Sequence, residues 1–202
     1  MLAERVLGGE SGSTGWLRSS ALAWVGLALA GTAFLAASAR ISIPLPFTPV
    51  PITAQTLAVL LVGALYGARL GLATVLAYLA EGLAGLPVFH QGTFGPAVLF
   101  GPTGGYLIGF AVAAFIVGWL LEERRRPGVL ATVAAFLIGD IVLNALGTLW
   151  LAHFVGVGHA WADGVLPFIP GEVVKIVVAT AVLASGRRLL ARYQRRTVRG
   201  VT

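Results

Sequence analysis

Two charged side chains, Glu172 and Lys175, stand three residues apart near the start of a long apolar run, PFIPGEVVKIVVATAVLASG. Lys175 is the only lysine among the 202 residues of the chain. Residues three apart share one face of a helix, so the two side chains can reach each other. The lysine offers three N–H donors and the glutamate offers oxygen acceptors. Together they suit a ligand that carries both N–H donors and an anionic or carbonyl oxygen.

A purely structural role for this pair is also open. Glu172 lies in the first turn after Pro170, where the helix dipole favours an acid. Lys175 can pair with Glu172 or extend its charge outward towards water. A charged side chain within a membrane helix costs roughly 2.5–3.5 kcal/mol, and either role must offset that free energy. The spacing alone does not choose between the two roles.

The composition is typical of an integral membrane protein. Hydrophobic residues make up 57% of the chain and charged residues only 11%, and the mean hydropathy is +0.90. Soluble domains carry roughly 25% charged residues. The absence of cysteine excludes disulfides, thiolate zinc ligands and cysteine nucleophiles. We therefore expect an all-α membrane fold built from apolar helices of about 20 residues.

The apolar runs predict six transmembrane helices in a single membrane domain. Prolines within residues 44–51 exclude a helix interior after the first run, so we expect an extended loop there. Further loops are expected at 87–101 and 159–168, where glycine, proline or polar residues interrupt the pattern. The predicted spans are approximately 20–39, 53–68, 70–86, 102–121, 129–155 and 170–189, and the polar or basic tails are 1–19 and 190–202.

The arginines predict how the bundle is oriented. Cytoplasmic loops of membrane proteins are enriched in lysine and arginine. With the N-terminus placed inside, only Arg40 falls on the outer face. Both termini are therefore predicted to be cytoplasmic in a multi-pass plasma-membrane protein, and the basic charge indicates topology rather than nucleic-acid binding. The arginines expected inside are Arg5, Arg18, Arg69, Arg124, Arg125, Arg126, Arg187, Arg188, Arg192, Arg195, Arg196 and Arg199.

Several further residues of the predicted bundle are candidates for a binding site. Phe47, in the proline-rich outer loop, either covers an outward-facing cavity or anchors the loop in lipid. Tyr106 follows GPTGG, whose glycines let a ligand or another backbone come close. The polar side chains within the predicted spans are Gln55, Tyr78, Glu81, Tyr106, Asp140 and Asn144, and neighbouring helices or the interface are the alternative partners for Glu81 and Asp140.

The sequence lacks the common catalytic motifs. Lys175 precedes Ile176, so no P-loop can be formed around the single lysine. His90, His153 and His159 do not have the H-E-x-x-H spacing, and no G-x-S-x-G is present. We expect a chain that is not an enzyme and has no metal site or cofactor. If it transports actively, the energy comes from an ion gradient or from a partner.

Four stretches, taken in order, resemble the BioY family, the biotin-specific substrate-binding (S) components of energy-coupling factor (ECF) transporters. They are ISIPLPFTPVPITAQTLAVLLVGALYGARLG, YLAEGLAGLPVF, LFGPTGGYLIGF and GVLPFIPGEVVK, and the resemblance extends over roughly residues 20–190. It implies a six-helix S component in a prokaryotic cell membrane, with a biotin pocket near the outer face closed by the loop between the first two spans. It also implies a transmembrane T component and two cytoplasmic ATPases as partners, which alone use ATP.

The resemblance also assigns roles to individual residues. The family's acid-x-x-lysine pair falls on Glu172 and Lys175, with glutamate where aspartate is usual. The polar position after GLPVF falls near Gln91, whose amide can meet a ureido group or a carboxylate. Asn144 stands where tyrosine is more common. The other matched positions are Gly85 and Tyr106 in the pocket wall, and the small residues Ala33 and Ala37 resemble the docking surface for the T component. Asp163, in the last outer loop, is a further and weaker candidate for the site.

Biotin binding would explain why the two charges are kept. Biotin combines a ureido ring, with N–H donors and a carbonyl acceptor, with an apolar thiophane and chain and a carboxylate. We expect Glu172 to accept from the ureido N–H groups and Lys175 to donate to the carbonyl or to the carboxylate, with apolar walls around the rest. Two alternatives stay open: an S component for another small vitamin, and a self-sufficient biotin carrier without an ATPase. An intramembrane enzyme is disfavoured, because no nucleophile–base or metal constellation is present.

Overall fold

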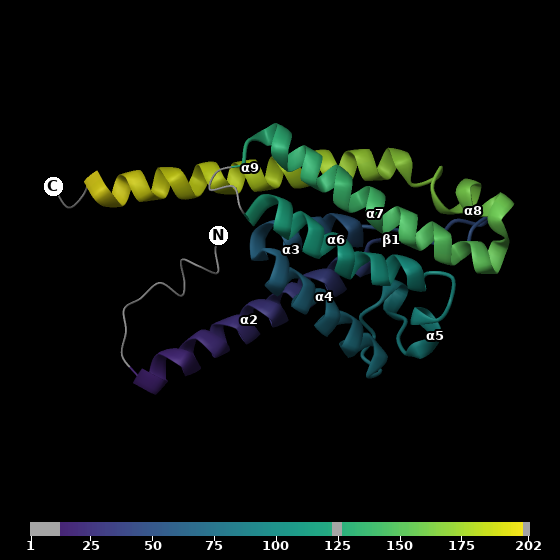
Figure 1. The fold of residues 1–202 in the computed structure, drawn as a ribbon, viewed down its shortest axis with the longest axis horizontal. Coiled ribbons are helices and arrows are strands. Elements are labelled where there is room, and N and C mark those ends of the chain that lie inside the picture. The colour runs from purple at the N-terminus through teal and green to yellow at the C-terminus, as the bar shows by residue number, and fades with distance from the viewer. Residues whose placement is uncertain (1–12, 123–126, 200–202) are drawn as a thin grey trace.

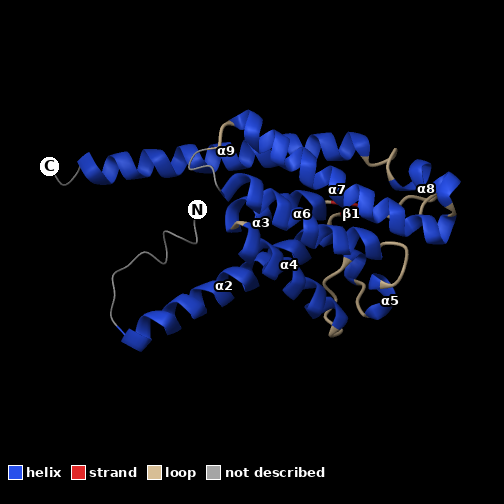
Figure 2. Ribbon diagram, viewed as in Figure 1, coloured by secondary structure: helices blue, strands red, loops and turns tan. Residues whose placement is uncertain are grey.

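The computed structural model describes residues 13–122 and 127–199, which form a bundle of six long helices joined by short elements (Figures 1 and 2). The helical architecture agrees with the predicted all-α class. The long helices are α2 (Ser13–Arg40), α3 (Gln55–Tyr66), α4 (Ala68–Leu83), α6 (Gly104–Glu122), α7 (Val129–Val155) and α9 (Ile169–Arg199). The short elements are β1 (Ser42–Ile43), β2 (Ile52–Thr53), η1 (His90–Gly92), α5 (Pro96–Leu99) and α8 (Val157–Gly164).

Four of the described helices, α2, α6, α7 and α9, are long and apolar enough to cross a membrane. Helix α3 has 12 residues and α4 has 16. Both are shorter than the roughly 20 residues that a perpendicular span requires. The apolar helices therefore indicate a membrane protein, while the six-span count and the cytoplasmic position of both termini stay predictions.

A sharp break at Gly67 separates α3 from α4. Gly67 has φ 82° and ψ 178°, a conformation that residues with a Cβ rarely adopt. The chain turns back at this residue, so that Gly63 and Gly71, four residues to either side, face each other. Glu122, at the end of α6, accepts a hydrogen bond from the Ala68 N–H at 3.2 Å and so satisfies one free donor at the start of α4.

Helix α6 is the central element of the bundle. Of the residues in its most apolar stretch, 67% are buried, against 17% in α2. It packs against α3, α4 and α7, and the contacts use glycines that let the backbones approach closely. Gly63 of α3 lies against the Ala114 backbone, and Gly109 of α6 lies against the Leu143 backbone of α7. This packing fixes the distances between the helices that carry the cavity described below.

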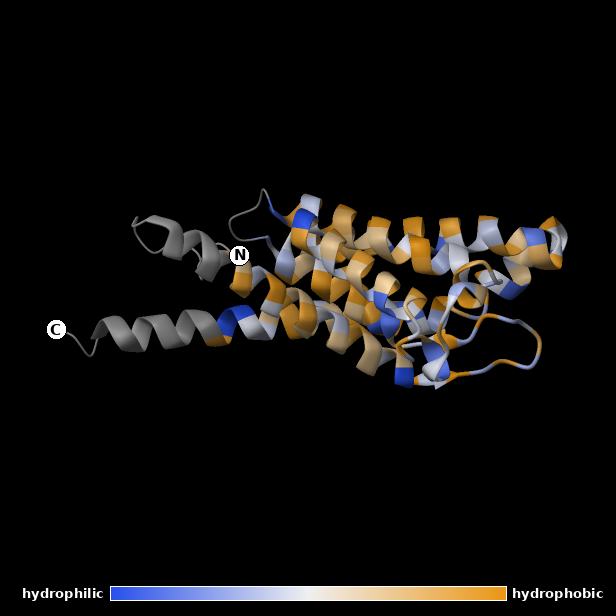
Figure 3. Ribbon diagram, turned by 90° about the horizontal axis from the view of Figure 1, so that it is seen from below, coloured by the Kyte–Doolittle hydropathy of each residue, from blue (hydrophilic) through white to orange (hydrophobic). Residues whose placement is uncertain are grey.

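The outward faces of the helices are largely apolar. Figure 3 shows hydrophobic residues along the sides of the described helices and more polar ones towards the ends. Large side chains such as Leu130, Leu149 and Val177 are more than half exposed, at 82%, 69% and 62%. Exposed apolar surface of this extent is expected where lipid tails cover it.

Two of the short elements, α5 and α8, lie at the end of the bundle opposite to the start of α2 and the end of α9, and we call this the loop end (Figure 1). The proline-rich loop is extended as predicted, with its two strands paired antiparallel. The prediction of a loop over 159–168 is wrong in its first part, because α8 occupies Val157–Gly164. Ala160 and Gly164, four residues apart, are buried and give this polar segment a packing face.

The close approach at Gly63 generates a test of the packing. A Cβ at Gly63 would lie 2.6 Å from the Ala114 carbonyl oxygen, so Gly63→Ala must displace backbone. We expect this variant to lose about 1–3 kcal/mol of stability, measured as a drop of several degrees in the apparent melting temperature of the detergent-solubilised protein. Gly26→Ala is the control, because a Cβ there meets nothing within 4 Å. An equal melting temperature for both variants would contradict the packing at Gly63.

Candidate functional site

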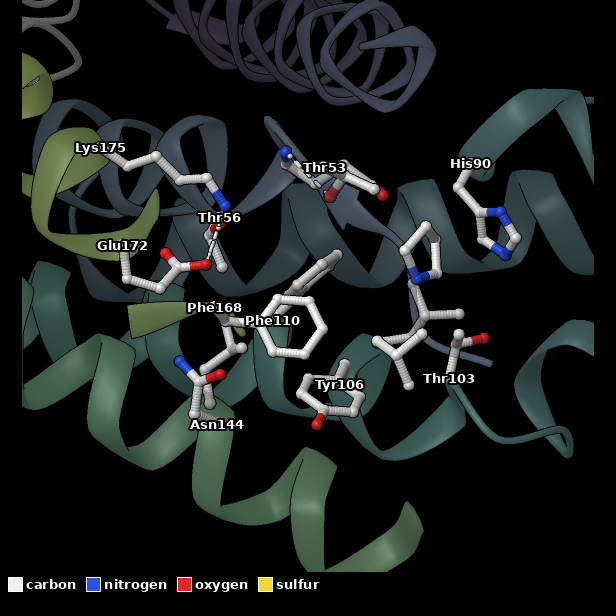
Figure 4. Close-up of a pocket in the computed structure, with 15 residues that line it drawn as sticks. Thr53, Thr56, His90, Thr103, Tyr106, Phe110, Asn144, Phe168, Glu172 and Lys175 are labelled. Carbon is white, nitrogen blue, oxygen red and sulfur yellow. Dashed lines mark hydrogen bonds and ion pairs between the residues drawn. The ribbon is translucent and has the colours of Figure 1, made fainter. Parts of the chain in front are cut away.

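A cavity opens at the loop end between α3, α6, α7 and α9 (Figure 4). It contains about 490 Å³ of empty space, including the part open to solvent. All three of the predicted outer loops and four helices contribute to it, although they are far apart in the sequence. The lining residues are Val50, Pro51, Thr53, Gln55, Thr56, His90, Thr103, Tyr106, Leu107, Phe110, Leu143, Asn144, Phe168, Glu172 and Lys175.

A three-way polar contact lies at one side of the cavity (Figure 4). The Lys175 Nζ donates to Glu172 Oε1 at 2.8 Å and to Thr56 Oγ1 at 2.7 Å. The Thr56 hydroxyl in turn donates to Glu172 Oε1 at 3.2 Å. These contacts join α9 to α3, and they use two of the three N–H groups of the lysine. The third N–H group and Glu172 Oε2, which has no hydrogen-bond partner in the structure, are available to a ligand.

The same contact bears on the two roles that the sequence left open. Glu172 does lie in the first turn of α9, and it does pair with Lys175. Both side chains are nevertheless directed into the bundle and line the cavity, and Glu172 is only 7% exposed. A buried ion pair contributes little net stability, because desolvation offsets its attraction. Internal pairing and ligand binding are therefore compatible at this position.

Helix α7 brings two more polar side chains to this side of the cavity. Asn144 lines it and donates from Nδ2 to the Asp140 carbonyl oxygen at 2.9 Å. Asp140 lies one turn earlier and is buried, near Glu172 and Lys175. Asp140 Oδ1 has no hydrogen-bond partner among the described residues. Two carboxyl groups and one lysine thus meet where α7 and α9 pack together.

A chain of hydrogen bonds fixes the orientation of Gln55. The Tyr78 hydroxyl donates to the Val88 carbonyl oxygen at 2.8 Å, and Gln55 Nε2 donates to the Tyr78 oxygen at 2.8 Å. The Val88 carbonyl can only accept, so Tyr78 must spend its one hydrogen there and accept from the amide. This leaves the amide oxygen and the second amide N–H of Gln55 free, so that the oxygen can accept from a ligand N–H.

Tyr106 contributes its ring rather than its hydroxyl to the cavity. The hydroxyl donates to the Gly164 carbonyl oxygen of α8 at 2.7 Å. The ring lines the cavity with Phe110, one turn further along α6, and packs in a tilted arrangement against Phe168 at 6.3 Å between centroids. These side chains form an apolar wall facing the polar side of the cavity, as Figure 4 shows.

The structure brings together five of the nine residues that the sequence predicted for binding, and it places four outside the cavity lining. The five are Gln55, Tyr106, Asn144, Glu172 and Lys175. The other four lie as follows: Phe47 is 59% exposed in the loop between β1 and β2, Gly85 is exposed with φ 100°, Gln91 is exposed with φ 54°, and Asp163 is half-buried on α8. Their roles in binding stay predictions.

Sequence reasoning missed Thr56 and His90. Thr56 directly follows Gln55, and two polar residues at the start of an apolar helix are a signal that was available. His90 precedes the predicted Gln91 by one position and takes its place in the lining. Among the described residues, no group of three or more histidine or carboxylate side chains is arranged to hold a metal ion.

Helix α2 lies beside the site without lining it. The predicted docking residues Ala33 and Ala37 are four apart and both exposed, so they share an outward face of this helix. At its end, Arg40 donates from a guanidinium nitrogen to the Pro87 carbonyl oxygen at 2.5 Å. This contact ties α2 to the segment that carries His90.

Comparison with known proteins connects this geometry to one family. The model of the BioY family matches residues 14–192 of the chain. The Rhizobium etli protein named biotin transporter BioY is 41% identical over 159 residues, which cover 75% of this chain and 83% of the relative. The Lactococcus lactis protein named biotin transporter BioY2 is 39% identical over 155 residues, covering 74% of this chain and 82% of the relative.

The fold is also similar to a solved structure. The crystal structure at 2.1 Å of the S-component for biotin from an ECF-type ABC transporter superposes with a TM-score of 0.77. The two chains are 28% identical, and the match covers 84% of this chain and 93% of the other.

His90 generates a prediction about pH. Burial lowers the pKa of His90 below its usual value of 6.5. Below about pH 6.5 the unfolded chain binds a proton at His90, whereas the folded protein does so only at lower pH. The free energy of unfolding therefore decreases as the pH is lowered, by at most about 1.4 kcal/mol per pH unit. When the pH is lowered from about 7.5 to about 5, we expect the apparent melting temperature to decrease less in His90→Gln than in the wild type.

The control for the His90 experiment is His159→Gln, which removes an exposed histidine from α8. It should follow the wild-type profile. If His90→Gln and the wild type lose the same melting temperature on acidification, the buried neutral state of His90 is contradicted.

Proposed function

The chain belongs to the BioY family, and from this premise we propose that it binds biotin in the cavity described above and mediates biotin uptake as the S component of an ECF-type transporter. The observation that carries the proposal is the contact of Lys175, Glu172 and Thr56 in a cavity with an opposing apolar wall. A chain without catalytic motifs keeps these charges in apolar surroundings because a polar ligand uses them.

The chemistry of biotin matches the groups of this cavity. The ureido N–H groups of biotin meet two free acceptors, Glu172 Oε2 and the amide oxygen of Gln55. The remaining N–H of Lys175 donates to the ureido carbonyl or to the carboxylate. The thiophane ring and the aliphatic chain pack against the wall formed by Tyr106 and Phe110. Each polar group of the ligand thus finds a complementary partner, which is the requirement for burying it.

Calorimetric titration of biotin into the purified, detergent-solubilised chain tests the binding function. We expect saturable one-site binding without any partner or ATP. Competition with desthiobiotin and thiamine separates biotin from other vitamins, since thiamine lacks the ureido ring. A folded protein that binds thiamine and not biotin would overturn the assignment.

Lys175→Ala tests the residue that we expect to matter most. Removing one member of a buried, hydrogen-bonded charge pair costs about 2–5 kcal/mol of binding free energy, so biotin affinity should fall by at least about 30-fold. Val174→Ala is the matched control, because Val174 is the preceding residue of α9 and is 61% exposed on the outer face. Wild-type affinity in Lys175→Ala, with Val174→Ala equally unaffected, would exclude the pair from the site.

The topology follows from the same proposal. We place both termini and the basic segment between α6 and α7 in the cytoplasm of a prokaryotic cell, with six helices in the plasma membrane and the loop end facing outward. The arginine distribution supports this orientation. The start of α2 and the end of α9 lie at the same end of the bundle, which is consistent with it (Figure 1). The cavity then opens towards the side from which biotin arrives.

The energy for uptake comes from partners in this proposal. The sequence has no P-loop, and the similar solved structure is described as the S-component of an ECF-type ABC transporter. We propose a transmembrane T component that docks on the exposed face of α2 around Ala33 and Ala37, together with two cytoplasmic ATPases. Small residues on this face allow close approach of a partner helix.

Larger side chains on the exposed face of α2 test whether the T component docks there. We expect the double variant Ala33→Trp and Ala37→Trp to lose co-purification with a co-expressed T component and ATPases while keeping its biotin affinity. Ala134→Trp on the exposed face of α7 is the control and should keep both. Unchanged co-purification would move the docking surface elsewhere, and biotin uptake by vesicles that lack all partners would favour a self-sufficient carrier.

A further inference from the structure

His90 brings an unpaired ring nitrogen to the cavity. Its side chain is half-buried and lines the cavity wall. The Nδ1 atom is buried without a hydrogen-bond partner among the described residues. A buried polar atom without a partner costs free energy, and a ligand group that pairs with this nitrogen removes that cost.

The backbone around His90 holds the imidazole in place. The His90 carbonyl oxygen accepts from both the N–H and the hydroxyl group of Thr93, at 3.0 and 2.8 Å. The next residue, Gln91, has φ 54°, a left-handed conformation that is uncommon for a residue with a side chain. Gln91 is exposed as a result, and the turn presents the imidazole to the cavity instead.

His90 and the ion pair of Lys175 with Glu172 lie on opposite sides of the cavity (Figure 4). Among the described residues of the lining, Lys175 and His90 are the two that can carry a positive charge. Lys175 is already paired with Glu172 at 2.8 Å. Thr103, on the same side as His90 in Figure 4, donates its hydroxyl hydrogen to the Val98 carbonyl oxygen. The donor that remains on this side for an anion is therefore His90.

A permanent positive charge lies behind His90. Arg40, at the end of α2, donates to the Pro87 carbonyl oxygen at 2.5 Å. A Cβ at Gly92 would lie 2.6 Å from the Arg40 Nη1 atom, so the guanidinium group is against η1. Arg40 does not line the cavity and acts on it only through its electric field. This field favours an anion on the His90 side.

We propose that His90 binds the carboxylate of the ligand and is the residue that selects for the acid end of biotin. This inference rests on the proposed function and decides between the two partners left open for Lys175, which then donates to the ureido carbonyl. The ligand lies across the cavity, with its ureido ring at α9 and its carboxylate at η1. Its apolar middle packs against the wall formed by Tyr106 and Phe110.

A ligand without the carboxylate isolates the contribution of His90. Biotinamide keeps the ureido ring, the thiophane and the chain, but it carries no charge. His90→Leu removes the donor and keeps a side chain of similar size. At pH 7 we expect this variant to lose about tenfold or more of its affinity for biotin and little of its affinity for biotinamide. His90→Asn keeps an N–H donor near the position of Nδ1 and should recover part of the loss.

Two further variants serve as controls. His159→Leu removes an exposed histidine from α8 and should bind both ligands as the wild type does. Lys175→Ala should weaken both ligands by a similar factor, because the ureido ring is common to them. An unchanged ratio of biotin to biotinamide affinity in folded His90→Leu would overturn the proposal. A ratio that falls in Lys175→Ala and not in His90→Leu would assign the carboxylate to the lysine.

The pH dependence of the wild type gives a test that needs no folded variant. Burial lowers the pKa of His90 in the free protein, and a bound carboxylate favours the charged imidazole. Biotin affinity should therefore rise by about threefold or more when the pH is lowered from about 7.5 to about 6, and biotinamide affinity should not. The other titratable or charged groups facing this region are Arg40 of α2, Tyr78 and Glu81 of α4, Tyr106 of α6, Asp140 of α7, and Glu172 and Lys175 of α9.

The comparison of the two ligands separates His90 from these groups. Arg40 stays charged throughout this pH range, and the groups of α7 and α9 lie at the ureido end, which both ligands share. An equal pH response for biotin and biotinamide would contradict a carboxylate at His90. Folded wild-type protein that binds neither ligand would instead overturn the proposed function itself.

Discussion

A positive charge enclosed in an apolar bundle is the constraint on which the site depends. The desolvation of an ion costs several kcal/mol even after a protein relaxes around it, so Lys175 must be surrounded by acceptors. Glu172 supplies them from the same helix and Thr56 from α3. The first turn of α9 is thereby held against α3 at a fixed position. The buried acid Asp140 lies nearby on α7.

The tight apolar packing elsewhere makes this convergence possible. Helix α6 lies against α3 through Gly63 and against α7 through Gly109, in contacts that leave no room for a further methyl group. Backbones this close move together, which keeps the polar side of the cavity at a constant distance from Tyr106 and Phe110 on α6. The glycines therefore act on the site without touching it, because they set the separation of the helices that carry it.

The features that could be predicted from the sequence are those with a large effect on free energy. Long apolar runs indicate membrane helices, and a charge within such a run is rare because it is costly. Helix α9 and its charged pair, Glu172 and Lys175, could therefore be found without a structure. Thr56 has no such signature, since a hydroxyl is easily accommodated in a helix and gains its role only where α3 meets α9. His90 and Gln91 differ by one position, and the turn that decides which faces the cavity, with Gln91 at φ 54°, is a local backbone choice.

The chain of hydrogen bonds that begins at the Val88 carbonyl has a fixed donor-to-acceptor direction. This direction lets the site distinguish ligands that present a hydrogen-bond donor to Gln55 from ligands that do not. Tyr78 transmits the acceptor character of a backbone group outside the cavity to the amide oxygen of Gln55 within it. A molecule of the same shape that presents a carbonyl or a methylated nitrogen to the Gln55 amide oxygen leaves this acceptor unpaired, at a cost of about 1–3 kcal/mol. Discrimination between ligands of equal size at this point thus depends on a peptide group outside the cavity lining, which orients the Gln55 side chain through Tyr78.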